Sequence, residues 1–310
     1  MKNKISIIIP VYNNLKHTSN CLNTLNRMLS DGGLTESVSI IVIDDGSTDG
    51  TFDWIKRHFP QTIVLNGDGT LWWSGGVNLG TRYAFQELDS EYILWWNNDI
   101  SPSPDYLTKL IPIIVNKGAF IGGSKIYYAD KPNKIWSMGG IFDTRNGRKY
   151  MIGMNETDSD HYNKAIQVDW LPGMGTFIHK SVFEKIGYVD DKNFPQYHGD
   201  SDFTFRAKLA GYIITVYPEL KIWNDKSNSG LMHQNSTRQL IKTLHDIKSN
   251  YHILKDIQFY SRYATSIFAY QTILHKYCYY IGGFIKWKLL NLIGLSKKAS
   301  PLNSNIPLNQ

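Results

Sequence analysis

Cysteine is scarce in this chain of 310 residues, and the two that occur, Cys21 and Cys278, stand far apart. Their separation gives no support to a disulfide framework or a thiolate metal site, and a reducing compartment is the simplest interpretation. The sequence also lacks a phosphate loop ending in Gly-Lys-Ser/Thr, and no Gly-x-Gly-x-x-Gly follows its first apolar run. Backbone cradling of phosphates is therefore excluded, and another group must neutralise any phosphate charge.

Long apolar runs are absent as well. The run at 5–11 is too short for a signal-peptide core and leads directly into Asn13 and Asn14, so it predicts a first strand. The apolar stretches at 264–274 and 277–285 fall short of the ~20 residues that a spanning helix needs. We therefore expect a cytoplasmic chain that does not cross a bilayer.

Acidic residues are few near the end of the chain. Residues 236–298 hold ten Lys or Arg against two Asp, although the whole chain has a formal charge of only +6. Because Trp, Phe, Ile and Leu are mixed with these basic residues, the pattern favours peripheral contact with the cytoplasmic face of a membrane over nucleic acid. A solvated helical face and a homodimer surface are the alternatives.

What the chain does contain is a large apolar fraction, 42%, with only 19% charged residues. The β-branched runs at 5–11 and 38–43 are typical of strands buried in a parallel sheet, with a helix between them. This order predicts an α/β fold with a C-terminal helical extension. We expect a nucleotide-binding half at 1–115, a second half at 116–235, a basic helical extension at 236–298 and a flexible tail at 299–310.

Four segments in this order resemble the signatures of glycosyltransferase family 2. They are Ile-Ile-Ile-Pro-Val-Tyr-Asn-Asn at 7–14, Val-Ile-Asp-Asp-Gly-Ser-Thr-Asp at 42–49, Trp-Asn-Asn-Asp at 96–99 and His-Gly-Asp-Ser-Asp-Phe at 198–203. The resemblance spans residues 5 to about 225. It implies a GT-A fold, which is a Rossmann-like mixed sheet flanked by helices, with an acceptor half at 116–235. It also implies an inverting enzyme that moves a sugar from a nucleotide-sugar donor to a hydroxyl of a glycan or lipid-linked acceptor.

The resemblance also assigns the donor side of the site. Asp45 matches the carboxylate that hydrogen-bonds a pyrimidine base, although it could instead stabilise its own turn. In the loop expected at 67–80, glycines would let the backbone approach a ligand, and Trp72 and Trp73 either stack on it or belong to the core. The residues expected to contact the nucleotide sugar are Pro10, Tyr12, Asp45, Gly76, Asn78 and Asn97.

A divalent cation, Mn²⁺ or Mg²⁺, is the expected cofactor. Asp99 follows an apolar run with no basic neighbour, so it suits a hard cation, unless it only caps the next helix. The family's usual Asp-x-Asp is here Asn97-Asn98-Asp99, with a single carboxylate. Asp225 is the expected second ligand, and His233 is a fallback.

Asp200 matches the family's catalytic base, which accepts the proton of the acceptor hydroxyl. Gly199 stands where the family often has Glu. Trp170 is the expected stacking contact for an acceptor sugar, with core packing as the alternative, and Asp202 is expected beside the acceptor or as a helix brace. The thinned acidic motifs leave a non-catalytic nucleotide-sugar-binding or scaffold protein as the second hypothesis. The paired tryptophans resemble those of a rhamnosyltransferase-like branch, so the expected donors are dTDP-rhamnose or a UDP-hexose.

Overall fold

The structure is a computed structural model that describes residues 4–118, 120–225 and 236–293. These form two compact units, which are described separately. Unit 1 takes its described residues from 4–140, 151–195 and 199–225, and unit 2 from 141–150, 196–198 and 236–293. The C-terminal part of the chain therefore shares its unit with two short segments that we expected in the acceptor half. The predicted tail at 299–310 and His233 lie outside the described residues.

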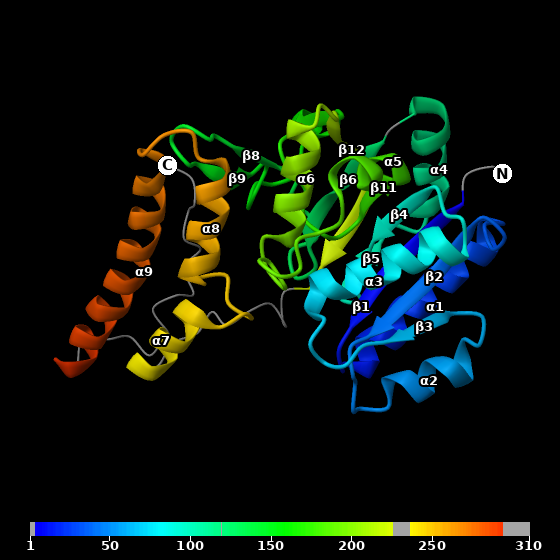
Figure 1. Cartoon of the computed structure of the whole chain (residues 1–310), viewed down its shortest axis with the longest axis horizontal. Helices are drawn as coiled ribbons and strands as arrows, with labels where there is room; N and C mark the ends of the chain where they lie inside the picture. The colour runs from blue at the N-terminus through cyan, green and yellow to red at the C-terminus, as the bar shows by residue number, and fades with distance from the viewer. Residues whose placement is uncertain (1–3, 119, 226–235, 294–310) are drawn as a thin grey trace. The chain divides into compact units, whose positions relative to one another are not determined.

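Unit 1 is built on a ten-stranded mixed sheet (Figure 1). Its main path runs β10-β12-β6-β11-β4-β1-β2-β3, while β5 pairs with β12 and β7 with β6. Strands β3, β2, β1 and β4 are parallel, and β11 enters antiparallel between β4 and β6. The strands are β1 Ile5–Val11, β2 Val38–Asp44, β3 Ile63–Asn66, β4 Tyr92–Trp95, β5 Ile100–Pro102, β6 Ile121–Tyr128, β7 Ile135–Ser137, β10 Ile166–Val168, β11 Thr176–His179 and β12 Ile214–Asn224.

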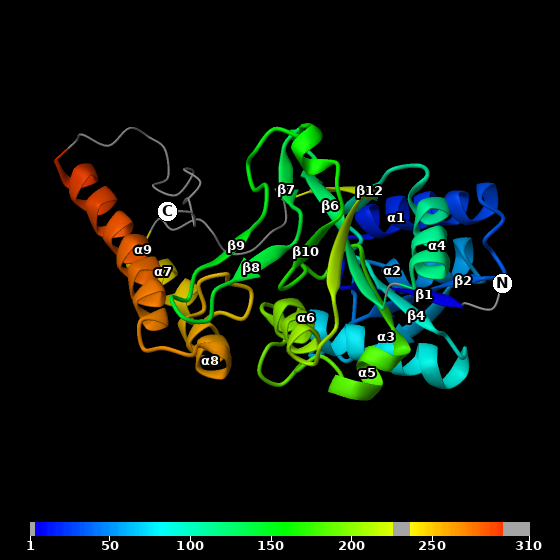
Figure 2. The same cartoon turned by 90° about the horizontal axis from the view of Figure 1, so that it is seen from above.

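Helices cover both faces of this sheet. Figure 2 shows α1 and α4 on one side and α3 and α5 on the other. The helices are α1 Leu15–Asp31, α2 Thr51–His58, α3 Trp72–Glu87, α4 Tyr106–Lys117, α5 Lys180–Ile186 and α6 Gly199–Leu209, with a 3-10 turn at Asp160–Tyr162. Alternate residues of β1 enter two different cores: Ile7 packs with α1 and α4, and Ile8 packs with α3 and α5. The predicted mixed α/β sheet with flanking helices is confirmed.

The glycine-rich stretch expected to be a loop at 67–80 is instead mostly helix α3. A Cβ at Gly76 would lie 3.0 Å from Pro10 Cβ, and one at Gly80 would lie 2.7 Å from Ile43 Cδ1. These glycines therefore let the helix lie close against β1 and β2. Gly76 is therefore explained by packing, and its expected contact with the donor stays a prediction.

Unit 2 contains most of a short hairpin and three helices. The hairpin strands are β8 Gly140–Phe142 and β9 Lys149–Met151, and the helices are α7 Thr237–His245, α8 Ile253–Tyr263 and α9 Ala269–Leu292. The hairpin turn is bonded to the helices, because Tyr260 donates its hydroxyl to Gly147 O and Thr272 donates to Asn146 O. Gly282 and Gly283 lie inside α9.

Candidate active site

The carboxyl ends of β1, β2 and β4 lie side by side at one edge of the sheet. Val11 pairs with Asp44, and the Asp45 N–H donates to Val11 O at 2.9 Å. Ile8 pairs with Trp95, so Asn97 follows β4 at the same edge. In open α/β sheets, ligands bind beyond this edge. It therefore brings together three of the expected donor contacts, at Pro10, Asp45 and Asn97.

Asp45 organises the loop that leads into α3. Its carboxylate is buried and accepts N–H groups from Gly69 at 2.9 Å, Leu71 at 3.2 Å and Trp72 at 2.9 Å. The partners lie 24 to 27 residues further along the chain, so Asp45 bridges two loops and does more than stabilise its own turn. Tyr12, by contrast, is 56% exposed, which leaves its ring open to a ligand.

Asn78 faces the interior of unit 1. Its amide Nδ2 donates to Val189 O at 2.8 Å and to Asp191 Oδ2 at 3.0 Å, and its Oδ1 accepts the Val189 N–H at 3.1 Å. The Asn78 amide thus makes three hydrogen bonds to residues 189–191, and the side chain is 1% exposed. Asn78 therefore fixes this part of the chain. These bonds give Asn78 a structural role, and its expected contact with the donor stays a prediction.

Trp73 connects two of the motifs. Its indole Nε1 donates to Asn97 Oδ1 at 3.1 Å, and its ring meets Trp95 edge-on with centroids 5.4 Å apart. The ring also lies so close to Gly173 that a Cβ there would stand 2.2 Å from Trp73 Cζ2. Sequence left Trp73 undecided between ligand and core; the structure shows it partly buried, bridging Asn97 and Gly173.

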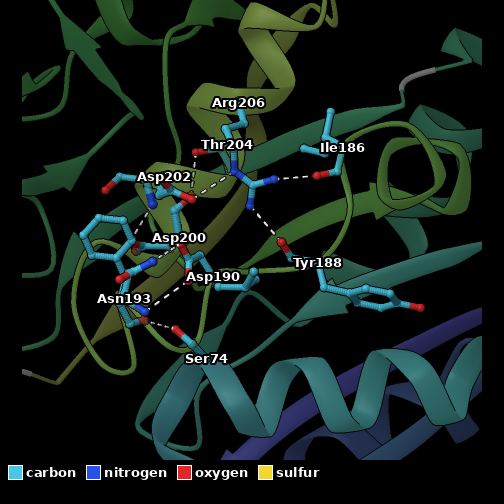
Figure 3. Close-up of polar contacts among 12 residues, drawn as sticks. Ser74, Ile186, Tyr188, Asp190, Asn193, Asp200, Asp202, Thr204 and Arg206 are labelled. Carbon is cyan, nitrogen blue, oxygen red and sulfur yellow. Dashed lines mark hydrogen bonds and ion pairs between the residues drawn. The ribbon is translucent and has the colours of Figure 1, made fainter. Parts of the chain in front are cut away.

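Asp200 lies at the start of α6, where Figure 3 shows it among its neighbours. Its Oδ2 accepts the Gly173 N–H at 2.8 Å, and its Oδ1 accepts the Ser201 N–H at 2.7 Å. The first of these bonds joins Asp200 to the bridge made by Trp73. A continuous set of contacts therefore runs from Asn97 through Trp73 and Gly173 to the candidate base.

Gly199 is required by packing. A Cβ at this position would lie 2.3 Å from Ser74 Oγ and 3.0 Å from Phe194 O. Ser74 in turn donates to Phe194 O, and Figure 3 shows it pointing from α3 toward the loop that carries Asn193. The family's frequent Glu would not fit here without a shift, which explains the departure that the sequence shows.

The two expected acceptor contacts are buried side chains. Asp202 is fully buried and pairs with Arg206 at 3.0 Å, and Arg206 also donates to Ile186 O and Tyr188 O (Figure 3). Trp170 is 5% exposed, and its ring fills the space that a side chain at Gly140 would need. Asp202 therefore braces α6 and Trp170 packs in the core, which are the alternatives that the sequence left open, and their contact with an acceptor stays a prediction.

Asp99 and Asp225 line one small cavity of about 230 Å³, with Asn98 and His17 also in its wall. The Asp225 N–H donates to Asp99 O at 3.2 Å, so the two residues are adjacent. Burial raises the pKa of Asp99, and Asp225 adds to this effect while His17 opposes it. Asp99 Oδ1 is buried without a hydrogen-bond partner in the described part of the chain, which suits an oxygen meant for a cation.

A mixed sheet of this strand order, with helices on both faces, matches the GT-A class of fold. The model of the family described as "Glycosyl transferase family 2" matches residues 6–187, and the chain belongs to this family. Both steps confirm the resemblance drawn from the four signatures.

Named relatives are distant. The low-salt glycan biosynthesis hexosyltransferase Agl10 of Haloferax volcanii is 25% identical over 67% of this chain and 62% of its own length. The dTDP-rhamnosyl transferase RfbF of Shigella flexneri is 24% identical over 65% of this chain and 64% of its own. The chain thus spans less than two thirds of the length of either protein.

Solved structures agree on the fold. Mannosyltransferase PcManGT from Pyrobaculum calidifontis, in complex with GDP-Man and Mn²⁺, covers 90% of this chain and 70% of its own at 13% identity, with a TM-score of 0.53. TarS residues 1–349 of S. aureus, in complex with UDP-GlcNAc, covers 73% of this chain and 59% of its own at 18% identity, with a TM-score of 0.52. At these identities the likeness speaks for the fold alone.

Proposed function

We propose that the chain is an inverting glycosyltransferase that moves a sugar from a nucleotide-sugar donor to a hydroxyl of a glycan or lipid-linked acceptor. The observation that carries this proposal is the contact path from Asn97 through Trp73 and Gly173 to Asp200. It ties the end of β4, on the donor side, to a carboxylate suited to act as a base. Family membership supports the same reaction type.

Asp200 is the proposed catalytic base. The Gly173 and Ser201 amides hold one bond to each carboxylate oxygen, which fixes the orientation of the group and leaves a lone pair on each oxygen for the acceptor. As the acceptor oxygen forms its bond to the anomeric carbon, its proton passes to Asp200, and the bond from that carbon to the diphosphate oxygen breaks. A single displacement inverts the anomeric configuration.

The donor is proposed to lie against Pro10, Tyr12 and Asn97, with Asp45 beside the base. Asp45 already accepts three backbone N–H groups, so it bonds a pyrimidine base through the acceptor capacity that its two oxygens keep. A dTDP- or UDP-sugar supplies such a pyrimidine, and the relative named a dTDP-rhamnosyl transferase is consistent with this donor class.

Asp99 and Asp225 are the proposed holders of Mn²⁺ or Mg²⁺. No group of three or more His, Cys, Asp or Glu side chains suited to a metal occurs among residues 4–118, 120–225 and 236–293, so oxygens of the donor and water would complete the shell. When bound, such a cation neutralises charge on the leaving diphosphate. The unpartnered Asp99 Oδ1 is the observation that supports this assignment.

A donor panel tests the proposal. UDP- and dTDP-sugars are incubated with Mn²⁺, Mg²⁺ or EDTA, and hydrolysis or transfer is followed for the wild type and for Asp200→Asn, Asp99→Asn and, as a matched control, the exposed Asp105→Asn. We expect Asp200→Asn to lower kcat by about 10²- to 10⁴-fold with donor binding retained. We expect Asp99→Asn to weaken Mn²⁺ binding measured by electron paramagnetic resonance. Turnover that survives Asp200→Asn unchanged would refute the assignment of the base.

A further inference from the structure

Helix α9 of unit 2 carries two apolar faces, and only one of them is covered. Ile273, Tyr277, Tyr280 and Phe284 are buried, with Tyr280 and Phe284 packed against Leu240 of α7. Figure 1 shows α8 along one side of α9. We call a second apolar stripe of α9, which lies beside the buried one and is exposed to solvent, the outer face. It consists of Leu274, Cys278, Ile285, Leu289 and Leu292.

The outer face is long and continuous. Its members recur at spacings of three, four or seven residues, which places them on one side of a helix. The helix has 24 residues and is therefore about 36 Å long. Leu289 is 57% exposed and Leu292 is 77% exposed, and Ile267, just before the helix, is 76% exposed. An apolar stripe of this length on a water-soluble surface marks a binding surface.

The charges beside the outer face distinguish between the candidate partners. Helix α9 contains Lys276, Lys286 and Lys288 but no Asp or Glu. Lys276 pairs with the buried Asp256, while Lys286 and Lys288 are exposed and Lys288 donates to Thr237 Oγ1 at 3.0 Å. A second copy of α9 would bring lysines against lysines without the opposite charges that pair helices in a coiled coil. A surface of anionic lipid, in contrast, complements both the lysines and the apolar stripe.

We infer that the outer face of α9 binds the surface of an anionic phospholipid bilayer, with the helix lying in the plane of the interface. No helix of the described residues is long and apolar enough to span a bilayer. Residues 236–268, which precede α9, match this charge preference, since they contain five Lys or Arg and two Asp. The inference rests on the proposed function only for its purpose, which is to bring the enzyme to a lipid-linked acceptor.

Vesicle flotation of the purified full chain tests this inference. Phosphatidylcholine vesicles are compared with vesicles that also contain phosphatidylglycerol, at low and high salt. We expect binding only to the second kind, weakened about fivefold by each of Lys286→Gln and Lys288→Gln and about tenfold by Ile285→Ser or Leu289→Ser. The matched control is Ile241→Ser, which removes an equally exposed isoleucine from α7 and should leave binding unchanged.

Three outcomes would overturn the inference: no flotation with either vesicle, flotation insensitive to the α9 variants, or a concentration-dependent dimer in gel filtration that the same variants dissociate. The last would assign the outer face to a second copy. Circular dichroism verifies that each variant is folded. Donor hydrolysis measured without lipid separates the two proposals. Lipid binding without any donor hydrolysis would refute only the proposed transferase activity. Donor hydrolysis without lipid binding would refute only the proposed lipid-binding face.

Discussion

The contact between Trp73 and Gly173 allows a stability prediction that needs no substrate. In Gly173→Ala the new Cβ would stand 2.2 Å from Trp73 Cζ2 and 2.5 Å from Cη2, so the indole must move. The φ angle of Gly173 is not positive, so an alanine suits the backbone and the cost is steric. Trp73→Phe removes the atoms that would clash, and it also removes the Nε1 bond to Asn97.

The expected magnitudes follow from these two changes. Overpacking in Gly173→Ala should lower the free energy of unfolding by about 1 to 3 kcal/mol. Trp73→Phe should lower it by about 1 to 2 kcal/mol, through a lost hydrogen bond and reduced contact with Trp95. In the double variant the alanine enters the space that the indole has left. We therefore expect a favourable coupling free energy of about 1 to 2 kcal/mol.

Urea unfolding followed by tryptophan fluorescence is the appropriate assay. Eight of the nine tryptophans lie in unit 1, so the signal reports mainly on the unit that contains the contact. Trp73→Phe removes one of these tryptophans, so far-UV circular dichroism checks that the variant unfolds in the same kind of transition as the wild type. Effects that add to within about 0.5 kcal/mol would show that the two residues do not share this space and would refute the proposed bridge.

Three further predictions concern buried carboxylates. Asp202→Ala should lower the free energy of unfolding in urea by about 2 to 4 kcal/mol, because Arg206 keeps only carbonyl partners. The KM for acceptor should stay unchanged. Unchanged stability together with a raised KM for acceptor would instead indicate that Asp202 contacts the acceptor directly. Asp45→Ala should cost about 1 to 3 kcal/mol, since three backbone N–H groups lose their acceptor, and should weaken dTDP or UDP binding in calorimetry; unaltered stability would contradict this role. Burial and Lys149 lower the pKa of His198, so unit 2 should be most stable above pH about 6.5 and lose stability as the pH falls through about 6.5. Burial alone would raise the pKa of Asp256, but Lys276 and His198 outweigh this effect and lower it, so a second loss of stability should follow below pH about 4. Hydrogen exchange of α8 that is as well protected at pH about 5 as above pH about 6.5 would refute this prediction.

The strands at the donor edge could be predicted from sequence because their signal is local. Continuous β-branched runs indicate strands buried on both faces, and β1 and β2 appear almost where we expected them. Asp45 comes directly after β2, and Asp99 comes four residues after the end of β4, so both were expected beyond the carboxyl ends of strands. The positions of these residues needed no knowledge of long-range contacts.

The remaining differences come from contacts between distant parts of the chain. Helix α3 was mistaken for a loop because glycine normally disfavours helices, whereas Gly76 and Gly80 are set by the close approach of β1 and β2. Trp170 and Asp202 carry suitable chemistry, but sequence does not tell which way a side chain points. The sequence indicated only that Gly199 stands in place of an acidic residue. The structure gives the reason, because Ser74, 125 residues earlier, occupies the space beside it.

The Trp73 bridge lacked a clear signal for the same reason. One feature could have indicated it: a tryptophan and a glycine in two separate motif-like segments form a large and small pair of the kind that packs together. That pairing becomes evident only when the edge of β4 and the segment before β11 are neighbours.

The position of β11 also has a consequence for the making of the protein. Strand β4 has β11 as its second neighbour in the sheet, yet Thr176 pairs with Trp95, a residue synthesised 81 positions earlier. At about 5 to 20 residues per second, a ribosome needs about 4 to 16 seconds to supply that partner. During this time the apolar β4, whose residues are all buried in the finished sheet, has an open edge. Nascent chains paused or truncated before residue 176 should therefore depend most on chaperones.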